Sequence, residues 1–242
     1  MMGIRTAIAA LGLVMLAACS HDRGPPGPCG PSALGTSRIQ TVGLDAGPVP
    51  DLLARGEVVI TFDDGPHPSR TRRVLDLLDR ECVQATFFLL GTQAAANPGM
   101  VREIAARGHS LGAHSWNHAR LTESSVEAAV ADIDQGAAAI EAATGRPVMM
   151  FRFPYIDTSP ALSEAVREAG YLDVTVTVDG RDWLNISPGA SVQEILNRLE
   201  ANGRKGIVLL HDPFRSSDQR TRLLIDALKA ADYRVVALQP AG

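Results

Sequence analysis

Thr61-Phe62-Asp63-Asp64-Gly65-Pro66 sets two adjacent carboxylates directly after the apolar run Val58-Val59-Ile60. An Asp-Gly step is a strong turn signal, so this stretch alone predicts no more than a solvated turn. Whether it is a turn or a functional site depends on where the other polar clusters of the chain fall.

Strand-like and helix-like segments alternate from residue 56 onward. Apolar, β-branched or aromatic runs occur near residues 57–62, 84–90, 109–113, 148–152, 171–178, 206–210 and 234–238. The segments between them carry helix signals at Ser69, Asn97-Pro98, Ser124 with Glu127, Ser159-Pro160, and Ser191 with Glu194. Such alternation predicts parallel strands covered by helices, as an α/β distorted (β/α)7-type barrel in a single catalytic domain. An open doubly wound sheet is the rival topology.

Five polar clusters each follow one of the predicted strands. They are Asp63-Asp64, His114-Ser115-Trp116-Asn117-His118, Arg152-Phe153-Pro154-Tyr155, Asp179-Gly180-Arg181-Asp182-Trp183 and His211-Asp212. Parallel α/β barrels build their active sites at the carboxyl ends of the strands. The five clusters are therefore expected to meet on one rim.

The residue types in these clusters indicate a metal-dependent hydrolase. His114 and His118 are four residues apart, so on a helical turn both imidazoles would face one way, and one aspartate would complete a three-ligand open metal site. A His-x-x-x-His pair is a weak signal by itself. The neighbouring carboxylates Asp63 and Asp64 strengthen it, since one can hold the metal while the other acts as a base.

Four further side chains have candidate roles. Arg152 is expected to orient a carboxylate bidentately, and His211 is a candidate general acid. Asp182 either caps a turn or holds His211 in its protonated form. Trp116 either faces a ligand or packs in the core, and the sequence favours neither alternative.

The five clusters, read with Leu209-Leu210 before His211, resemble in type and order the five motifs of the polysaccharide deacetylases, carbohydrate esterase family 4. The resemblance covers about residues 56–240. Two positions depart from the usual pattern. Ile156 stands where glycine is usual and Ala113 where asparagine is common, and both departures bear on the shape of the substrate groove rather than on the chemistry.

This resemblance implies a divalent metal, Zn²⁺ or Co²⁺, held by Asp64, His114 and His118. It implies that Asp63 is the general base steered by Arg152, and that His211 is the general acid tuned by Asp182. The backbone N–H of Tyr155 would complete an oxyanion site. Three further residues would line the substrate pocket: Pro154, Trp183 and Leu209.

The first 55 residues read as an export signal and a tether. The apolar run 7–18 is too short to span a bilayer, but it suits a secretory signal, and Leu16-Ala17-Ala18-Cys19 resembles the bacterial lipoprotein processing box. We therefore expect a signal peptide over 1–18, a lipidated Cys19, and a tether over 19–55 before the catalytic domain, 56–242. A plain secretory signal is the alternative. Residues 20–50 hold six prolines and six glycines, a composition unable to bury a core.

The expected location is a membrane-anchored lipoprotein of the bacterial cell envelope. In an oxidising compartment Cys29 and Cys82 could form a disulfide, or they could remain two thiols. The net charge of −4 and the absence of a block of basic residues do not indicate nucleic-acid binding. We expect a monomer whose partners are an acetylated glycan and, through the lipid, a membrane.

The expected reaction is removal of N-acetyl groups from N-acetylglucosamine residues of peptidoglycan, an exopolysaccharide or a chitin-like oligomer. The alternatives are an O-acetyl esterase that uses the same site and a catalytically inactive glycan-binding protein. Two histidines and a carboxylate also form the facial triad of non-haem iron oxygenases, which are expected on an all-β scaffold.

Overall fold

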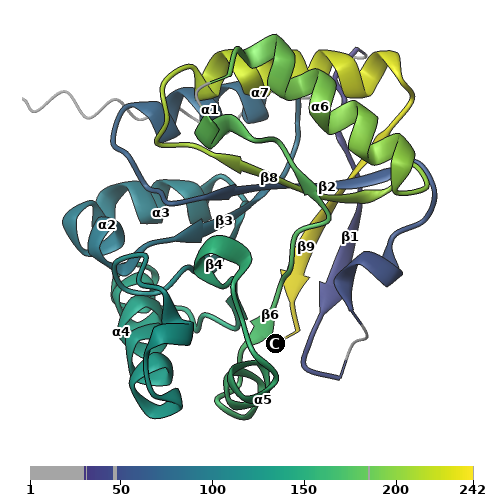
Figure 1. Ribbon diagram of the computed structural model, residues 1–242. Coiled ribbons are helices and arrows are strands. Elements are labelled where there is room, and N and C mark those ends of the chain that lie inside the picture. Colours follow the sequence, from purple (N-terminus) through teal and green to yellow (C-terminus); the bar gives the residue numbers. More distant parts are fainter. Residues whose placement is uncertain (1–29, 31, 46–47, 185, 242) are drawn as a thin grey trace, which may run out of the picture.

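A computed structural model describes residues 30, 32–45, 48–184 and 186–241. Its nine strands form one sheet in which every pairing is parallel (Figure 1). The strands are β1 (Thr36–Val42), β2 (Glu57–Asp63), β3 (Thr86–Leu89), β4 (Ser110–Ala113), β5 (Met150–Phe151), β6 (Leu172–Asp173), β7 (Val178–Asp179), β8 (Gly206–His211) and β9 (Arg234–Pro240).

Seven of these strands make the barrel, in the order β6-β5-β4-β3-β2-β8-β7. No pairing joins β6 to β7 in the described part of the chain, so the barrel is not closed by hydrogen bonds at that point. The β9 strand pairs with the first two residues of β2 and with the whole of β1. The predicted distorted α/β barrel is therefore confirmed, and the open doubly wound alternative is not what forms.

In the part of the chain that the structure describes, seven α-helices cover the outside of the sheet (Figure 1). They are α1 (Arg70–Arg80), α2 (Gly91–Ala96), α3 (Pro98–Ala106), α4 (Val126–Thr144), α5 (Pro160–Glu168), α6 (Pro188–Ala201) and α7 (Ser217–Ala230). Four short 3-10 helices lie in the connections: η1 (Val49–Leu52), η2 (Leu121–Glu123), η3 (Pro154–Ile156) and η4 (Asp182–Leu184).

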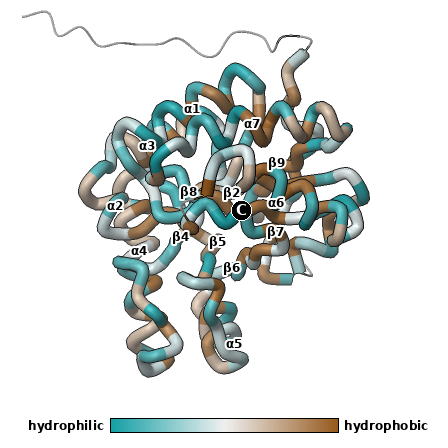
Figure 2. Tube along the Cα trace, turned by 45° about the horizontal axis from the view of Figure 1, so that its top comes forward, coloured by the Kyte–Doolittle hydropathy of each residue, from teal (hydrophilic) through white to brown (hydrophobic). Residues whose placement is uncertain are grey.

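The β2 strand is buried on both faces, as its near-continuous apolar sequence requires. Val58, Ile60 and Phe62 pack against helix side chains in the larger cluster of the core. Val59 points the other way, into a second cluster built from strands and the η1 segment, with Phe88 and Ile207. Figure 2 shows the hydrophobic residues gathered on the central strands and the hydrophilic ones on the outer turns of the helices.

The predicted tether contains a strand. Residues 36–42 alternate between exposed and covered side chains, and they pair in parallel with β9, for example Ile39 with Ala237. Arg38 anchors the strand through an ion pair of 2.7 Å to Glu57. The sequence analysis missed this strand because the prolines and glycines on both sides of the short amphipathic run dominate the composition.

Three other boundaries differ from the sequence prediction. The α4 helix is capped by the Ser125 side chain rather than by Ser124, and α6 begins one turn early, capped by Ser187 rather than Ser191. The predicted strand over 171–178 is split into β6 and β7. The side chain of Ser191 is buried and donates to the carbonyl of Gly180, so it fixes the start of the β7–α6 connection instead of capping a helix.

The N-terminal predictions lie outside the described residues. These are the signal peptide over 1–18, the lipidated Cys19 and the first part of the tether. Cys82 is disulfide-bonded, and the other two cysteines of the chain, Cys19 and Cys29, are outside the described part. Within the described ranges, no helix combines the length and the apolar character that crossing a bilayer demands.

Candidate metal centre and active site

Two neighbouring strands bring the first candidate residues together. In the pairing of β2 with β8, Asp63 lies opposite His211 and Thr61 lies opposite Leu209. Side chains alternate along a strand, so Thr61 and Asp63 lie on the same face as Val59, which is inside the barrel. The carboxyl end of the sheet therefore directs Asp63 and His211 toward one point, as the rim prediction requires.

Asp64, His114 and His118 form a cluster that fits a metal ion. Their ligand atoms all lie within 4.8 Å of one another. The Asp64 Oδ1 atom lies 3.4 Å from the His118 Nε2 and 3.6 Å from the His114 Nε2. This oxygen is buried and has no hydrogen-bond partner among the described residues, which is costly unless a cation completes the site.

The protonation of His114 also suits a metal ligand. Its Nδ1 lies 2.8 Å from the carbonyl oxygen of Arg152, so Nδ1–H donates there and leaves the Nε2 lone pair for a metal. Burial lowers the pKa of His114, and Asp63 and Asp64 only partly oppose this shift. The imidazole is thus favoured in the neutral form that binds metals.

The segment that carries both histidines is a turn, not the expected helical turn. Ser115 and His118 have positive φ angles of 65° and 66°, and the Ser115 side chain accepts from the His118 N–H at 3.0 Å. The N–H of Gly91 donates to the Ser115 carbonyl at 3.0 Å, and a side chain at Gly136 of α4 would come within 2.6 Å of that same carbonyl. The histidine turn is therefore wedged between α2 and α4.

Trp116 lies in the histidine turn and contacts both of these helices. The backbone N–H of Trp116 donates to the Asp132 carboxylate at 2.8 Å, and its backbone carbonyl accepts from the Thr92 N–H at 2.9 Å. The indole ring occupies the space next to Gly91 where a Cβ would otherwise lie. Of the two alternatives for Trp116, packing is the one that the contacts support.

Asp63 is held by a buried ion pair with Arg152, which has 0% exposure. The Nη1 group of Arg152 donates to Asp63 Oδ1 and to Thr61 Oγ1, both at 2.7 Å, and its Nε donates to the Val174 carbonyl at 2.8 Å. The guanidinium also lies over the Phe88 ring, 4.1 Å from the centroid. Burial lowers the pKa of Arg152, and the Asp63 carboxylate opposes that shift.

The predicted bidentate contact of Arg152 is wrong. Only Nη1 reaches Asp63, because Nε is committed to a backbone carbonyl, and Nη2 has no partner in the described part of the chain. The second carboxylate oxygen of Asp63 is consequently not engaged by the arginine. It lies 3.8 Å from the His114 Nε2, at the edge of the metal cluster.

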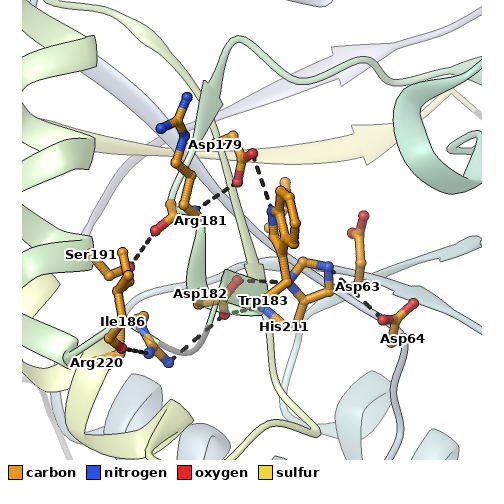
Figure 3. A network of polar contacts seen from close by, with 12 residues as sticks. Asp63, Asp64, Asp179, Arg181, Asp182, Trp183, Ile186, Ser191, His211 and Arg220 are labelled. Atoms are coloured by element: carbon orange, nitrogen blue, oxygen red, sulfur yellow. Dashed lines mark hydrogen bonds and ion pairs between the residues drawn. The ribbon is translucent and has the colours of Figure 1, made fainter.

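His211 is paired with Asp182 on the other side of the site (Figure 3). The His211 Nδ1 lies 2.7 Å from Asp182 Oδ1, and the His211 backbone N–H donates to Asp182 Oδ2 at 2.8 Å. Burial by itself would lower the pKa of His211, but the hydrogen bond and the charge of Asp182, together with the charges of Asp63 and Asp64, raise it to about 9. The ring stacks on Phe214, and its Nε2 faces the cluster, 3.9 Å from Asp64 Oδ2.

The candidate substrate-binding residues lie around these groups. Trp183 is 55% exposed, and its indole N–H donates to Asp179 at 3.4 Å (Figure 3). Leu209 and Pro154 are buried. Tyr155 is exposed, and its ring packs against the ring of His118 with a centroid distance of 4.4 Å.

Asp212 is a site residue to which the sequence analysis gave no role. It is fully buried, accepts a hydrogen bond from Thr71, and lies where a Cβ on Gly65 would be. Burial raises its pKa to about 7. Its position directly after His211 was the only sequence signal, and an acid after a strand is too common to be diagnostic.

Two other histidines of the described residues, His67 and His109, have structural contacts only. Burial lowers the pKa of His109 to about 4, and its Nδ1 accepts from the Ala85 N–H at 3.1 Å. His67 accepts from the N–H groups of Ser69 and Arg70, at the start of α1. Neither imidazole is part of the metal cluster.

Comparison with known proteins identifies the class to which this fold and site belong. The family model of polysaccharide deacetylase matches residues 53–174. The chain belongs to the polysaccharide deacetylase family. The predicted family is therefore confirmed, and the parallel sheet excludes the all-β scaffold expected for an iron oxygenase.

Individual relatives agree with this assignment. A peptidoglycan-N-acetylglucosamine deacetylase from Bacillus cereus is 37% identical over 187 residues, which are 75% of this chain and 85% of that protein. A chitooligosaccharide deacetylase from Azorhizobium caulinodans is 34% identical over 160 residues, 65% of this chain and 74% of the relative. The solved peptidoglycan deacetylase Bd3279 from Bdellovibrio bacteriovorus superposes with a TM-score of 0.79 at 30% identity, covering 87% of this chain and 61% of that one.

Proposed function

We propose that the protein is a metal-dependent N-deacetylase that removes acetyl groups from N-acetylglucosamine residues of a cell-surface or extracellular polysaccharide. The observation that carries this proposal is the Asp64, His114 and His118 cluster with Asp63 on one side and His211 on the other. Relatives named as peptidoglycan and chitooligosaccharide deacetylases support the substrate class.

Asp64, His114 and His118 would hold the cation, with Zn²⁺ as our first choice and Co²⁺ as the second. Two imidazoles and one carboxylate are a common ligand set of catalytic zinc, which keeps a further position open for water or substrate. When bound, the cation supplies Lewis acidity, which lowers the pKa of a water and polarises the acetyl carbonyl.

Asp63 is the proposed general base. Arg152 binds its Oδ1 and fixes the carboxylate plane, so Oδ2 is the oxygen turned toward the cluster and available to take a proton from the attacking water.

His211 is the proposed general acid. Its Nδ1–H is held by Asp182, so the proton it gives up is the one on Nε2, the atom that faces the site. Protonation of the departing sugar nitrogen is required because an amine anion is a very poor leaving group. The raised pKa of His211 keeps that proton in place at neutral pH.

The Tyr155 backbone N–H is the proposed donor to the developing oxyanion, and Trp183, Leu209 and Pro154 are proposed to form the walls around the acetyl group and the sugar. A donor fixed before the reaction stabilises the negative charge without reorganisation. The φ angle of 59° at Tyr155 gives its N–H an orientation that ordinary helical or extended backbone does not provide.

The proposed location of the protein is the bacterial cell envelope. Residues 1–18 would be a signal peptide, Cys19 would carry the lipid, and the residues between Cys19 and β1 would form the tether. The protein would be a monomer. Conversion of Cys19 to Ala should release the protein from the membrane fraction. If the variant stays in that fraction, or if the wild type is already released, the anchor is wrong.

The test is acetate release from peptidoglycan, chitooligosaccharides, poly-N-acetylglucosamine and acetylxylan, with chelation and metal restoration as the control. N-acetyl substrates should release acetate, and the chelator should abolish the release. Acetate from acetylxylan alone would favour the O-acetyl esterase. Glycan binding without any acetate release would favour an inactive binding protein.

A further inference from the structure

Tyr155 and Ile156 are two consecutive residues with positive φ angles, 59° and 54°. This left-handed region is unfavourable for any residue with a Cβ, and a β-branched residue such as Ile156 is a clear outlier there. Two hydrogen bonds close the turn, from the Ile156 N–H to the Phe153 carbonyl and from the Asp157 N–H to the Pro154 carbonyl, both at 3.1 Å. Such strain persists only where the surroundings hold it in place.

Two side chains contact the ring of Tyr155 beside this turn, His118 edge-to-face and Arg120 over the face of the ring. The ring of His118 packs on the Tyr155 ring at 4.4 Å, and the guanidinium of Arg120 lies over the same ring, 4.3 Å from its centroid. Arg120 Nη1 is bonded to Asp157 Oδ2 at 2.6 Å, and Thr122 donates to the same oxygen at 2.8 Å. Arg120 thus touches the strained turn twice, through the ring of Tyr155 and through the carboxylate of Asp157.

We propose that Arg120 is a positioning residue, which clamps the Tyr155–Ile156 turn onto His118 and so keeps the Tyr155 N–H aimed at the reaction site. The inference rests on the proposed function, in which that N–H is the oxyanion donor. Arg120 does not itself touch the substrate in this role. A glycine at position 156 would keep the turn left-handed without outside support. With isoleucine at this position, the contacts of Arg120 supply that support.

Conversion of Arg120 to Ala should lower kcat on chitooligosaccharides about two- to fivefold, the size of one exposed cation–π contact, and leave KM unchanged. In the Ile156→Gly background the same change should have almost no further effect, because glycine adopts the left-handed conformation freely. A substrate-binding arginine would give the opposite pattern, a higher KM with equal effect in both backgrounds, and that result overturns the proposal.

Hydrogen exchange gives a readout independent of catalysis. In the zinc-loaded full chain, the amides of Ile156 and Asp157 should exchange faster in Arg120→Ala than in the wild type. Arg167→Ala is the matched control, since Arg167 is also exposed and paired to a carboxylate, Glu164 at 2.6 Å, but it does not contact the Tyr155 ring. Unchanged exchange in Arg120→Ala overturns the clamp. Absence of acetate release by the wild type would instead reject the proposed function and leave the exchange test standing.

Discussion

Replacement of Asp182 by Asn tests the assignment of His211 as general acid. The Asp182 carboxylate makes two contacts with His211, to Nδ1 at 2.7 Å and to the backbone N–H at 2.8 Å. Burial lowers the pKa of His211, and Asp182 makes the largest opposing contribution, ahead of the charges of Asp63 and Asp64, so that the pKa is raised to about 9. In the Asn variant only the charges of Asp63 and Asp64 still oppose burial, and the pKa of His211 should fall toward its ordinary value of 6.5.

The size of the effect follows from the two pKa values. At about pH 7.5 a group with a pKa near 9 is about 97% protonated, whereas a group with a pKa of about 6.5 is about 9% protonated. The Asn variant should therefore lose about tenfold in activity at this pH, and the loss should shrink toward about twofold or less near pH 5.5, where both forms are protonated.

The assay is acetate release as a function of pH, with zinc content measured in parallel. The alkaline limb of the wild type should lie near pH 9, and that of the variant should move below about pH 7. Asp226→Asn, at an exposed position of α7, is the control for an added amide. An alkaline limb that does not move, or a loss that is equal at both ends of the pH range, would refute the role of Asp182.

Three further outcomes are expected. Asp63→Asn should reduce kcat by about 10²-fold or more with zinc content intact, as loss of a general base predicts, and zinc loss instead would mean that the two carboxylate roles are exchanged. Asp64→Ala should abolish stoichiometric zinc binding in equilibrium dialysis, and retained zinc would place the metal elsewhere. Asp212 has a pKa of about 7 in the fold against an ordinary 3.8, so its contribution to stability is present below about pH 4 and lost as pH rises to about 7. Asp212→Asn should remove that dependence, raising the free energy of unfolding at about pH 7.5 by up to about 4 kcal/mol and changing little at pH 4, and parallel pH profiles in urea titrations would contradict the assignment.

The barrel could be predicted from sequence because its strands are apolar runs separated by well-marked helix signals. Polar clusters after five of the seven runs then located the rim, since parallel strands end on the same side of the sheet. The β1 strand could not be found this way. It is exposed on one face and derives its order from β9, almost two hundred residues away in the chain.

Fine geometry was less accessible than the residue set. The spacing of His114 and His118 correctly indicated that both rings face one way, yet a turn, not a helix, brings them together. Arg152 was expected to bind a carboxylate with two of its N–H groups. One of these, Nε–H, instead donates to the backbone carbonyl of Val174, the residue after β6. Such competition for hydrogen bonds depends on tertiary neighbours that the sequence does not name.

Gly136 links the interior of a long helix to the chemistry of the site. A glycine in the middle of a helix weakens it by about 1 kcal/mol relative to alanine, and α4 accepts that loss so that the Ser115 carbonyl can approach its backbone. Improvement of the helix by alanine at this position would displace the turn between the two histidines. The residue that would most stabilise α4 as an isolated helix is therefore not the one that the packing of the folded protein allows at this position.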